Sequence, residues 1–342
     1  MEAKKEHILA TGGLGYIGSH TVVELLKSGY EVTVIDNLDN SSLEVLNRIE
    51  ELTSKMPNFY KGDVRDSEFL KDVFDKHAID TVIHFAGLKA VGESCEKPTL
   101  YYDVNVVGSV RLIEAMVEHD VTRIVFSSSA TVYGEPEELP ISENSPIKPA
   151  SPYGDTKMMV EKLLQSVSSS RPDLSIAILR YFNPVGAHQS GRIGENPKGT
   201  PNNLVPYITQ VAVGKHQHLN VFGDDYNTVD GTGVRDYIHV CDLANAHLKA
   251  IEYLSTNSGF NIWNIGVGKG YSVLEMVNTF ETINGVNIPY KILPRRPGDI
   301  DTCFADPKKA NDELNWSAEF GLEEMVRDSW NWQKNNPDGY DA

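Results

Sequence analysis

The stretch HILATGGLGYIG, residues 7–18, decides the fold. It begins with a short apolar run typical of a buried strand, and the run leads into glycines at Gly12, Gly15 and Gly18. Glycines at this spacing permit a tight turn and a close backbone approach, and a helix that begins there favours negative charge at its N-terminus. The stretch therefore predicts a strand, a dinucleotide-binding turn and a helix.

A second apolar run, residues 31–36, ends in Asp36. At this separation from the glycine turn, a carboxylate is expected to hydrogen-bond an adenosine ribose and to repel a 2′-phosphate. No arginine follows in NLDNSS, residues 37–42, so the sequence predicts NAD rather than NADP as the cofactor. Alternatively, Asp36 could lie in a solvated turn and bind no ligand. The glycines upstream make this alternative less favoured.

Short apolar runs rich in β-branched residues alternate with amphipathic segments along the first half of the chain. This alternation predicts the α/β class, with a doubly wound parallel sheet (Rossmann) whose ligands bind beyond the carboxyl ends of the strands. The strands are expected at residues 7–11, 31–36, 58–63, 81–86, 123–128 and 175–181. Gly62–Val64 and Phe85–Lys89 span the carboxyl ends of two of these strands and the residues after them, and are expected to line the adenine and pyrophosphate.

The pattern changes after Asn183. Residues 186–203 are rich in Gly, Pro and Asn without a hydrophobic period, which predicts a long loop. Helices are expected at residues 204–214 and 241–254 and near Trp330. We expect a cofactor-binding Rossmann domain over residues 1–186, rejoined by 236–266, and a smaller C-terminal substrate-binding domain over 187–342.

Composition excludes several classes of protein. The net charge of −17 argues against binding to nucleic acid or to anionic membranes. The three cysteines suit neither a disulfide framework nor a metal site, and the ten histidines lack metal-ligand spacing, so no metal is predicted. No signal peptide or bilayer-spanning run is found. We expect a cytoplasmic protein whose residues 1–6 form a short disordered lead.

The segment PYGDTKMMVEKLL, residues 152–164, places Tyr153 and Lys157 on one face of a helix. A phenol has a pKa of about 10 and becomes a base near neutral pH only when its anion is stabilised, which Lys157 and a cationic nicotinamide would do. The pair alone would be an ordinary surface feature, but the nucleotide turn upstream favours catalysis. Among the serines after residues 123–126, Ser129 is the preferred partner of Tyr153, and Ser127 can equally satisfy the strand end.

Eight strings extend this interpretation to a family. The chain closely resembles the UDP-galactose 4-epimerases, members of the extended short-chain dehydrogenase/reductases, over essentially its whole length. The resemblance rests on TGGLGYIGSH, DNLDNSS, HFAGLKAVGES, SSSATVYG, SPYGDTK, RYFNPVGAH, NNLVPYI and GTGVRDYIHV. It implies that UDP-galactose and UDP-glucose are interconverted in galactose metabolism by a homodimer with tightly held NAD. Tyr153 would remove the 4-hydroxyl proton.

The same resemblance implies the residues of each site. Those expected at the cofactor are Gly12, Gly15, Tyr16, Ile17, Gly18, Asp36, Asn37, Asn40, Ser41, Asp63, Val64, Phe85, Ala86, Gly87, Lys89, Asn105, Ser127, Tyr153, Lys157 and Tyr181. Those expected at the UDP-sugar are Lys89, Ser129, Tyr153, Asn183, Asn203, Leu204, Phe222, Arg235, Tyr237, Arg296, Asp299 and Cys303. Arg235 and Arg296 suit diphosphate oxygens, although a single arginine is more often part of a surface ion pair.

Two departures from related patterns refine the expectation. Related nucleotide-sugar 4,6-dehydratases carry an Asp-Glu pair where this chain has Ala130 and Thr131, so elimination of water lacks its side chains. At Cys303, family members restricted to unmodified hexoses carry a tyrosine. The smaller residue predicts that UDP-GlcNAc and UDP-GalNAc also interconvert, unless Cys303 is simply a buried small hydrophobe.

Two other functions remain open at this point. One is a net NAD-dependent nucleotide-sugar oxidoreductase, which would release NADH. The other is a non-catalytic NAD-binding regulator on the same fold, which the presence of both Tyr153 and Lys157 disfavours.

Overall fold

The computed structural model describes residues 6–296 and 299–340, and their contacts divide the chain into two compact units. Unit 1 takes in the described residues of Met1–Glu135, Pro146–Tyr181 and Ala244–Trp263, and unit 2 those of Pro136–Ser145, Phe182–Leu243 and Asn264–Ala342. The sequence assigned residues 1–186 and 236–266 to cofactor binding and 187–342 to substrate binding. That division stays a prediction. The expected lead lies outside the described residues except for Glu6, which accepts a hydrogen bond from Arg123 at 2.6 Å.

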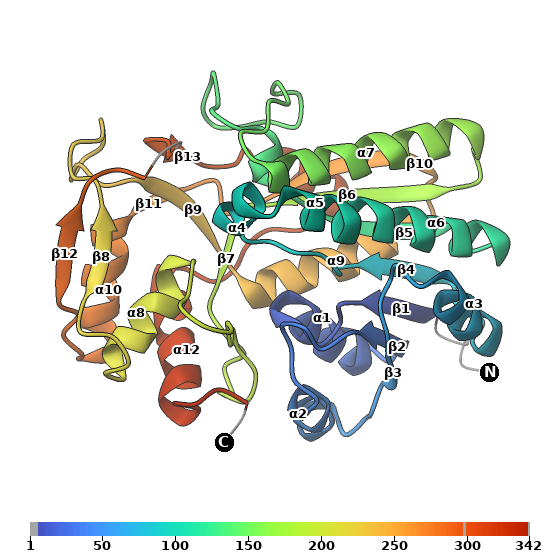
Figure 1. The fold of residues 1–342 in the computed structure, drawn as a ribbon, viewed down its shortest axis with the longest axis horizontal. Helices are drawn as coiled ribbons and strands as arrows, with labels where there is room; N and C mark the ends of the chain where they lie inside the picture. The colour runs from blue at the N-terminus through green and yellow to red at the C-terminus, as the bar shows by residue number, and fades with distance from the viewer. Residues whose placement is uncertain (1–5, 297–298, 341–342) are drawn as a thin grey trace. The chain divides into compact units, whose positions relative to one another are not determined.

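In the described part of the chain, unit 1 is built on a seven-stranded sheet with the order β10-β6-β5-β4-β1-β2-β3 (Figure 1). The strands are β1 (His7–Thr11), β2 (Glu31–Asp36), β3 (Asn58–Lys61), β4 (Thr81–His84), β5 (Arg123–Ser129), β6 (Ser175–Tyr181) and β10 (Gly259–Ile265). All pairings among β1 to β6 are parallel. The predicted α/β class and Rossmann sheet are therefore confirmed.

The strand order reverses between β1 and β4. From β1 the chain winds through β2 to β3, then returns to β4 and continues through β5 to β6. The carboxyl ends of β1 and β4 thus stand at the switch point where such sheets bind ligands. β3 and β4 end two residues earlier than predicted, so Gly62–Val64 and Phe85–Lys89 lie in the turns that follow them.

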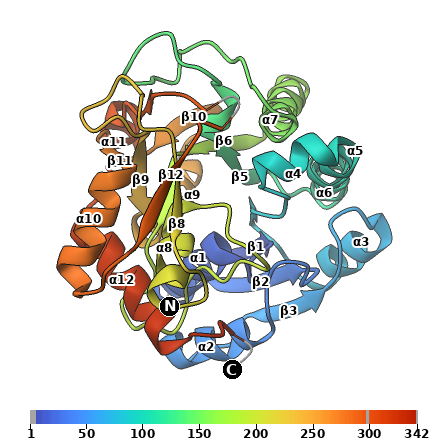
Figure 2. The same ribbon diagram turned by 60° about the vertical axis from the view of Figure 1, so that its left-hand side comes forward.

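Helices cover both faces of this sheet. Figure 2 shows α3, α6 and α7 along one face, with α1 and α2 on the opposite face. A hydrophobic core that includes Leu70, Leu112 and Val160 packs α3, α6 and α7 onto the strands. The helices are α1 (Tyr16–Lys27), α2 (Glu44–Thr53), α3 (Ser67–Lys76), α4 (Val91–Glu96), α5 (Pro98–Tyr101), the π-helix η1 (Tyr102–Val107), α6 (Gly108–Glu118), the 3₁₀ helix η2 (Ala130–Val132), α7 (Pro152–Ser170) and α9 (Val240–Leu254).

Unit 2 has its own sheets and core. Strand β9 (Val234–His239) pairs with β7 (Asn183–Val185), β11 (Gly270–Ser272) and β13 (Thr302–Cys303), and β8 (Leu219–Phe222) pairs with β12 (Tyr290–Leu293). The helices are α8 (Leu204–Ala212), α10 (Val273–Asn284), α11 (Lys308–Leu314) and α12 (Leu322–Asn335). The apolar faces of α8, α10 and α12 bury a core that includes Ile208, Phe280 and Met325.

Helices of unit 2 lie close to their expected positions. The helix expected at residues 204–214 ends at Ala212, and Gly214 adopts a positive φ of 82° just beyond it. A glycine in this left-handed conformation is a common way to end a helix. Among the described residues, no helix has the length and apolar character needed to cross a membrane.

Candidate active site

The glycine turn joins β1 to α1 and leaves no room for side chains. Gly12 has a φ of 69°, and a Cβ there would lie 2.8 Å from the backbone nitrogen of Ala86. A Cβ on Gly18 would lie 2.5 Å from the carbonyl oxygen of Gly12. Gly15 is the N-cap residue of α1, and Tyr16 and Ile17 begin its first turn. Backbone N–H groups at such a helix start can bind an anion.

Asp36 ends β2 and is held by the turn that follows it. Its Oδ2 accepts a hydrogen bond from the backbone of Leu14 at 3.1 Å, and its Oδ1 accepts from the backbone of Leu38 and the hydroxyl of Ser41. A carboxylate has about four acceptor sites. The three bonds fix the Asp36 carboxylate and leave acceptor capacity for a ribose hydroxyl.

The turn after β3 contains an ion pair that the motifs do not reveal. Asp63 accepts hydrogen bonds from Arg65 and from Asn37, and the Arg65 guanidinium lowers the pKa of Asp63 to about 2. Val64 beside it is buried in the core of unit 1. Asp63 therefore stays ionised over the physiological range and shapes the turn. Asn40 is exposed in the loop after β2.

Asn105, on the π-helix η1, fixes the turn after β4. Its Oδ1 accepts from the backbone of Leu88 at 2.8 Å, and its Nδ2 donates to the carbonyl of Leu88 and to Thr156 on α7. Phe85, Ala86 and Gly87 lead into this clamp, and Lys89 follows it with its ammonium 5.9 Å from the Tyr16 ring centroid. The predicted cofactor residues of this turn are thus tied to the helix that carries Tyr153.

Helix α7 brings Tyr153 and Lys157 to one face at the end of β5. Ser151 caps the helix by accepting from the backbone of Gly154 at 3.2 Å. The buried ammonium of Lys157 donates to the carbonyl of Ser127 at 2.7 Å and lies 5.9 Å from the Tyr153 ring centroid. Burial lowers the pKa of Lys157 to about 8, and the charge of Glu161 opposes this shift.

Tyr153 and Ser129 form the polar contact expected of a proton-transfer pair. Burial raises the pKa of Tyr153, whereas its hydrogen bond with Ser129 lowers it. The backbone and hydroxyl of Thr131 both donate to Ser129 Oγ, at 3.2 and 3.0 Å. Thr131 therefore orients Ser129.

The two preceding serines point to other partners. Ser127 Oγ lies 2.6 Å from the hydroxyl of Tyr181, which also hydrogen-bonds His247 in the core. Ser128 donates to the carboxylate of Glu161. The three consecutive serine hydroxyls thus have different hydrogen-bond partners, and Ser129 is the one hydrogen-bonded to Tyr153.

A buried ion pair was missed by the motif analysis. Glu161 accepts two hydrogen bonds from Arg180 on β6, and Arg180 also donates to the hydroxyl of Tyr133 at 2.8 Å. No spacing in the sequence points to this pair, because its members are 19 residues apart on different elements. The pair ties α7 to β6 one turn after Lys157.

In unit 2 the predicted arginines gather around one carboxylate. Arg235 donates to Asp299 Oδ1 at 2.7 Å, and Arg296 Nε lies 3.7 Å from Asp299 Oδ2. The Arg296 guanidinium also stacks on Phe222, 4.4 Å from the ring centroid. Cys303 is the register partner of Arg235 on β13. Five residues from four segments thus form one cationic and aromatic cluster.

The remaining predicted substrate residues occupy two other places in unit 2. Asn183 on β7 pairs in register with Tyr237 on β9, and burial raises the pKa of Tyr237 to about 12. Asn203 precedes Leu204 at the N-cap position of α8, and its side chain donates to Glu195 at 3.1 Å instead of capping the helix. These residues are held on regular elements beside the loop 186–203.

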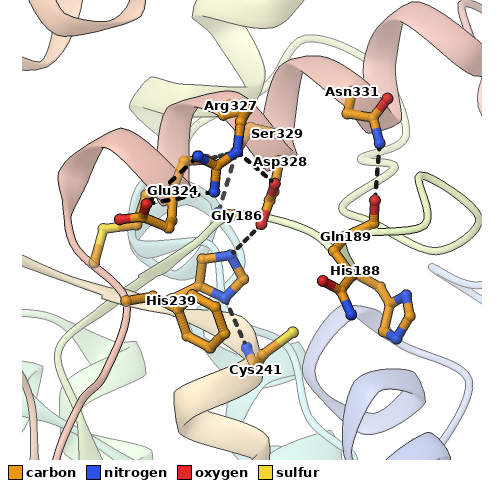
Figure 3. Close-up of polar contacts among 12 residues, drawn as sticks. Gly186, His188, Gln189, His239, Cys241, Glu324, Arg327, Asp328, Ser329 and Asn331 are labelled. Atoms are coloured by element: carbon orange, nitrogen blue, oxygen red, sulfur yellow. Dashed lines mark hydrogen bonds and ion pairs between the residues drawn. The ribbon is translucent and has the colours of Figure 1, made fainter. Parts of the chain in front are cut away.

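Two histidines of unit 2, His188 and His239, have polar partners within the protein. Figure 3 shows His239 between Cys241 and Asp328: its Nδ1 accepts from the backbone of Cys241 at 3.1 Å, and its Nε2 lies 3.4 Å from Asp328. His188 Nδ1 lies 2.7 Å from Ser190 Oγ. In the described parts of the chain, no group of three or more His, Cys, Asp or Glu side chains is placed to hold a metal ion.

The chain is similar to known proteins over nearly its whole length. A family model described as GDP-mannose 4,6 dehydratase matches residues 9–329. A UDP-glucose 4-epimerase from Bacillus subtilis is 58% identical over 333 residues, which cover 97% of this chain and 98% of the relative.

Solved structures agree in fold over nearly the whole length. The crystal structure of a UDP-glucose 4-epimerase from Bifidobacterium longum, in complex with NAD+ and UDP, is similar with a TM-score of 0.95 and 51% identity, covering 97% of this chain and 99% of the other. A UDP-Glc/GlcNAc 4-epimerase from Campylobacter jejuni is similar with a TM-score of 0.85 and 36% identity, covering 96% and 99% of the two chains.

Proposed function

Since the chain belongs to the UDP-glucose 4-epimerases, within the broader family of nucleotide-sugar short-chain dehydrogenases, we propose that it interconverts UDP-galactose and UDP-glucose. The reaction proceeds by transient oxidation of carbon 4 with tightly bound NAD. The observation that carries the proposal is the hydrogen bond between Ser129, at the end of β5, and Tyr153 on α7, together with the buried ammonium of Lys157 on the same helix. A non-catalytic regulator would not require these three groups together, whereas a net oxidoreductase would use the same groups and would differ by releasing NADH.

Unit 1 has residues that fit NAD. Backbone atoms lie where a Cβ on Gly12 or Gly18 would be. Because the turn carries no side chains at these positions, a pyrophosphate can approach the start of α1. The Asp36 carboxylate retains an acceptor site for the adenosine ribose and disfavours a 2′-phosphate. Bound NAD supplies the hydride acceptor at carbon 4 and the donor for the return step.

Proton transfer is the task of Tyr153 in this proposal. It takes the proton of the 4-hydroxyl as the C4–H bond breaks, which gives a 4-keto sugar nucleotide, and returns the proton to the oxygen after the sugar has turned over. Burial alone would make the phenol a poor base. The hydrogen bond with Ser129 opposes that effect. The ammonium of Lys157, 5.9 Å from the ring centroid, would stabilise the phenolate as it forms.

The UDP group is bound by the cluster in unit 2. Arg235 and Arg296 would bind diphosphate oxygens with their planar guanidinium groups, which suit phosphate geometry. Asp299 holds both arginines in position. Binding at a group remote from carbon 4 leaves the sugar free to present either face.

N-acetylated substrates are included in the proposal because of Cys303. Its side chain is small and lies on β13 beside Arg235 in the register of the sheet. Burial raises the pKa of the thiol to about 11, so Cys303 acts as a neutral, compact side chain near pH 7. A tyrosine there would occupy the volume that an N-acetyl group needs.

Homodimer formation and a cytoplasmic location belong to the proposal as well. Leu100, Val107 and Met159 on α5, η1 and α7 expose apolar side chains on unit 1, which favours self-association. Free cysteines at three positions suit a reducing compartment. Sedimentation of the wild type and of Met159→Glu tests the dimer, since a monomeric wild type would contradict it.

The activity is tested by incubating purified protein, without added NAD, with UDP-galactose or UDP-GalNAc and following epimer formation by NMR. Conversion of both substrates, lost in Tyr153→Phe, is the expected result. Conversion of UDP-galactose alone would contradict the N-acetyl part. No conversion even with added NAD would contradict the epimerase proposal.

A further inference from the structure

Tyr101 is a fully buried tyrosine of unit 1 whose hydroxyl bridges two residues at the start of α4. It ends α5, and its hydroxyl accepts a hydrogen bond from the backbone nitrogen of Ala90 at 3.0 Å. The same hydroxyl donates to Glu93 Oε2, also at 3.0 Å. Burial, and after it the bond with Glu93, raises the pKa of Tyr101. The phenol therefore keeps its proton near neutral pH and continues to donate.

This bridge takes the place of an ordinary helix cap. Ala90 is the N-cap residue of α4, and its side chain makes no capping hydrogen bond. In a capping box, the acidic residue three positions later accepts directly from the backbone nitrogen of the N-cap residue. Glu93 has that position, but the Tyr101 hydroxyl lies between it and Ala90. The start of α4 is thus fixed by a side chain from another helix.

Lys89 lies between two residues whose backbone is held in this way. Asn105 follows Tyr101 by four residues on the continuous run of α5 and η1. Its side chain binds both backbone groups of Leu88, at 2.8 and 3.0 Å. Tyr101 binds the backbone nitrogen of Ala90. One helical run therefore fixes the backbone on each side of Lys89.

The turn held by these contacts adjoins the active site. A Cβ on Gly87 would lie 3.1 Å from Asn105 Oδ1 and 3.8 Å from Lys157 Nζ. The Lys89 ammonium lies 5.9 Å from the ring centroid of Tyr16, in the first turn of α1, where backbone N–H groups can bind an anion. A lysine side chain loses much conformational freedom on binding, and a fixed backbone reduces the part that remains to be ordered.

From these contacts we propose that Tyr101 is a positioning residue for cofactor binding: it holds the backbone of Ala90 so that the Lys89 ammonium stays at the start of α1 and binds a phosphate oxygen of NAD. Tyr101 acts without contacting the cofactor itself. The inference rests on the proposed function, because it requires that unit 1 binds NAD. It also requires that the effect of Tyr101 on NAD passes through Lys89.

A double-variant cycle in the NAD-loaded full chain tests this coupling. The readout is the rate at which bound NAD leaves, measured by exchange against radiolabelled NAD. Lys89→Ala should speed release about tenfold, because a charge-assisted hydrogen bond is lost. Tyr101→Phe should speed it about fivefold, and the double variant should match Lys89→Ala within about twofold, since no lysine is left to position. Tyr102→Phe, at a partly buried neighbour on η1, is the control and should match the wild type.

Hydrogen exchange shows where the lost hydroxyl acts. In Tyr101→Phe the amides of residues 86–92 should exchange about tenfold faster than in the wild type, because the contact that closes this turn is gone. The amides of β5 and α6 should exchange at the wild-type rate. Faster exchange throughout α6 and β5 would indicate a general loosening of unit 1 and would overturn the inference.

Unchanged release of NAD in Tyr101→Phe or in Lys89→Ala would also overturn it. So would a double variant whose release rate is the product of the two single effects, because Tyr101 would then act independently of Lys89. These results leave the proposed function intact as long as the wild type converts UDP-galactose. If the wild type binds no NAD, the proposed function fails and the inference with it.

Discussion

The guanidinium of Arg180 donates two hydrogen bonds to the carboxylate of Glu161, at 3.0 and 2.7 Å, and both side chains are buried. Glu161 also raises the pKa of Lys157, which lies one turn earlier on α7. The ion pair thus has two separable effects. It joins α7 to β6, and its negative member keeps Lys157 protonated to higher pH than burial alone would allow.

Glu161→Gln should therefore change both stability and pH dependence. Removing one partner of a buried pair typically costs about 3–5 kcal/mol in unfolding free energy. Because the charge that raises the Lys157 pKa is lost, the alkaline limb of the kcat profile should move to lower pH. Urea unfolding and a kcat–pH profile measure the two effects.

The double variant Glu161→Met/Arg180→Met separates the effects. Replacing both members with apolar side chains should recover much of the lost stability, since neither charge is left buried alone. The shift of the alkaline limb should persist, because Glu161 is still absent. An alkaline limb at the wild-type position in both variants would show that Glu161 does not act on Lys157.

Asp36 should determine the preference for NAD over NADP. Asp36→Asn keeps an oxygen acceptor and removes the charge, so we expect NAD affinity to fall roughly tenfold and the discrimination against NADP to shrink. Calorimetric titration of apo protein with each cofactor measures both constants. Asp39→Asn, at an exposed residue of the same loop, is the control. Tighter binding of NADP than NAD by the wild type would refute the role of Asp36.

Features that depend on short spacings could be predicted from the sequence. The glycine turn, Asp36 at the end of its strand and the Tyr153–Lys157 pair each involve neighbours on a single element or βαβ unit, where periodicity fixes geometry. The ends of β3 and β4 were predicted two residues too late. Apolar pattern alone does not distinguish the last paired residue from the first residue of the turn.

Contacts between distant segments could not be predicted from spacing. Arg180 and Glu161 are 19 residues apart on different elements, and Tyr181 and His247 are 66 apart. Only the packing of α7 and α9 against the strands brings them together.

His84 should make the protein sensitive to acid. It is buried at the end of β4 between Thr11 and Ser109, with ring-to-hydroxyl distances of 2.7 and 2.9 Å. Burial, aided by the charge of Lys157, lowers its pKa from 6.5 to about 3. Between these values the unfolded chain binds a proton that the folded protein does not, so stability falls as pH falls from 6.5 towards 3.

His84→Gln removes this titration. Between pH 5.5 and 4 the wild type should lose about 1.4 kcal/mol of unfolding free energy per pH unit more than the variant does. Urea unfolding at several pH values gives the two slopes. A loss of unfolding free energy that is the same at every pH does not change the slope of the variant. Equal slopes would mean that His84 is protonated in the folded protein.

Cys303→Tyr should separate the two classes of substrate. A tyrosine on β13 beside Arg235 adds a ring where an N-acetyl group would lie, and steric overlap of this kind costs about 1–3 kcal/mol. We expect kcat/KM for UDP-GalNAc to fall roughly a hundredfold, equivalent to about 2.7 kcal/mol, and that for UDP-galactose to change by less than about threefold. NMR assays with each substrate measure both ratios. Cys303→Ser, which keeps the small volume, should retain both activities; an equal loss of both in Cys303→Tyr would instead show general damage to the Arg235 cluster and contradict a gating role for Cys303.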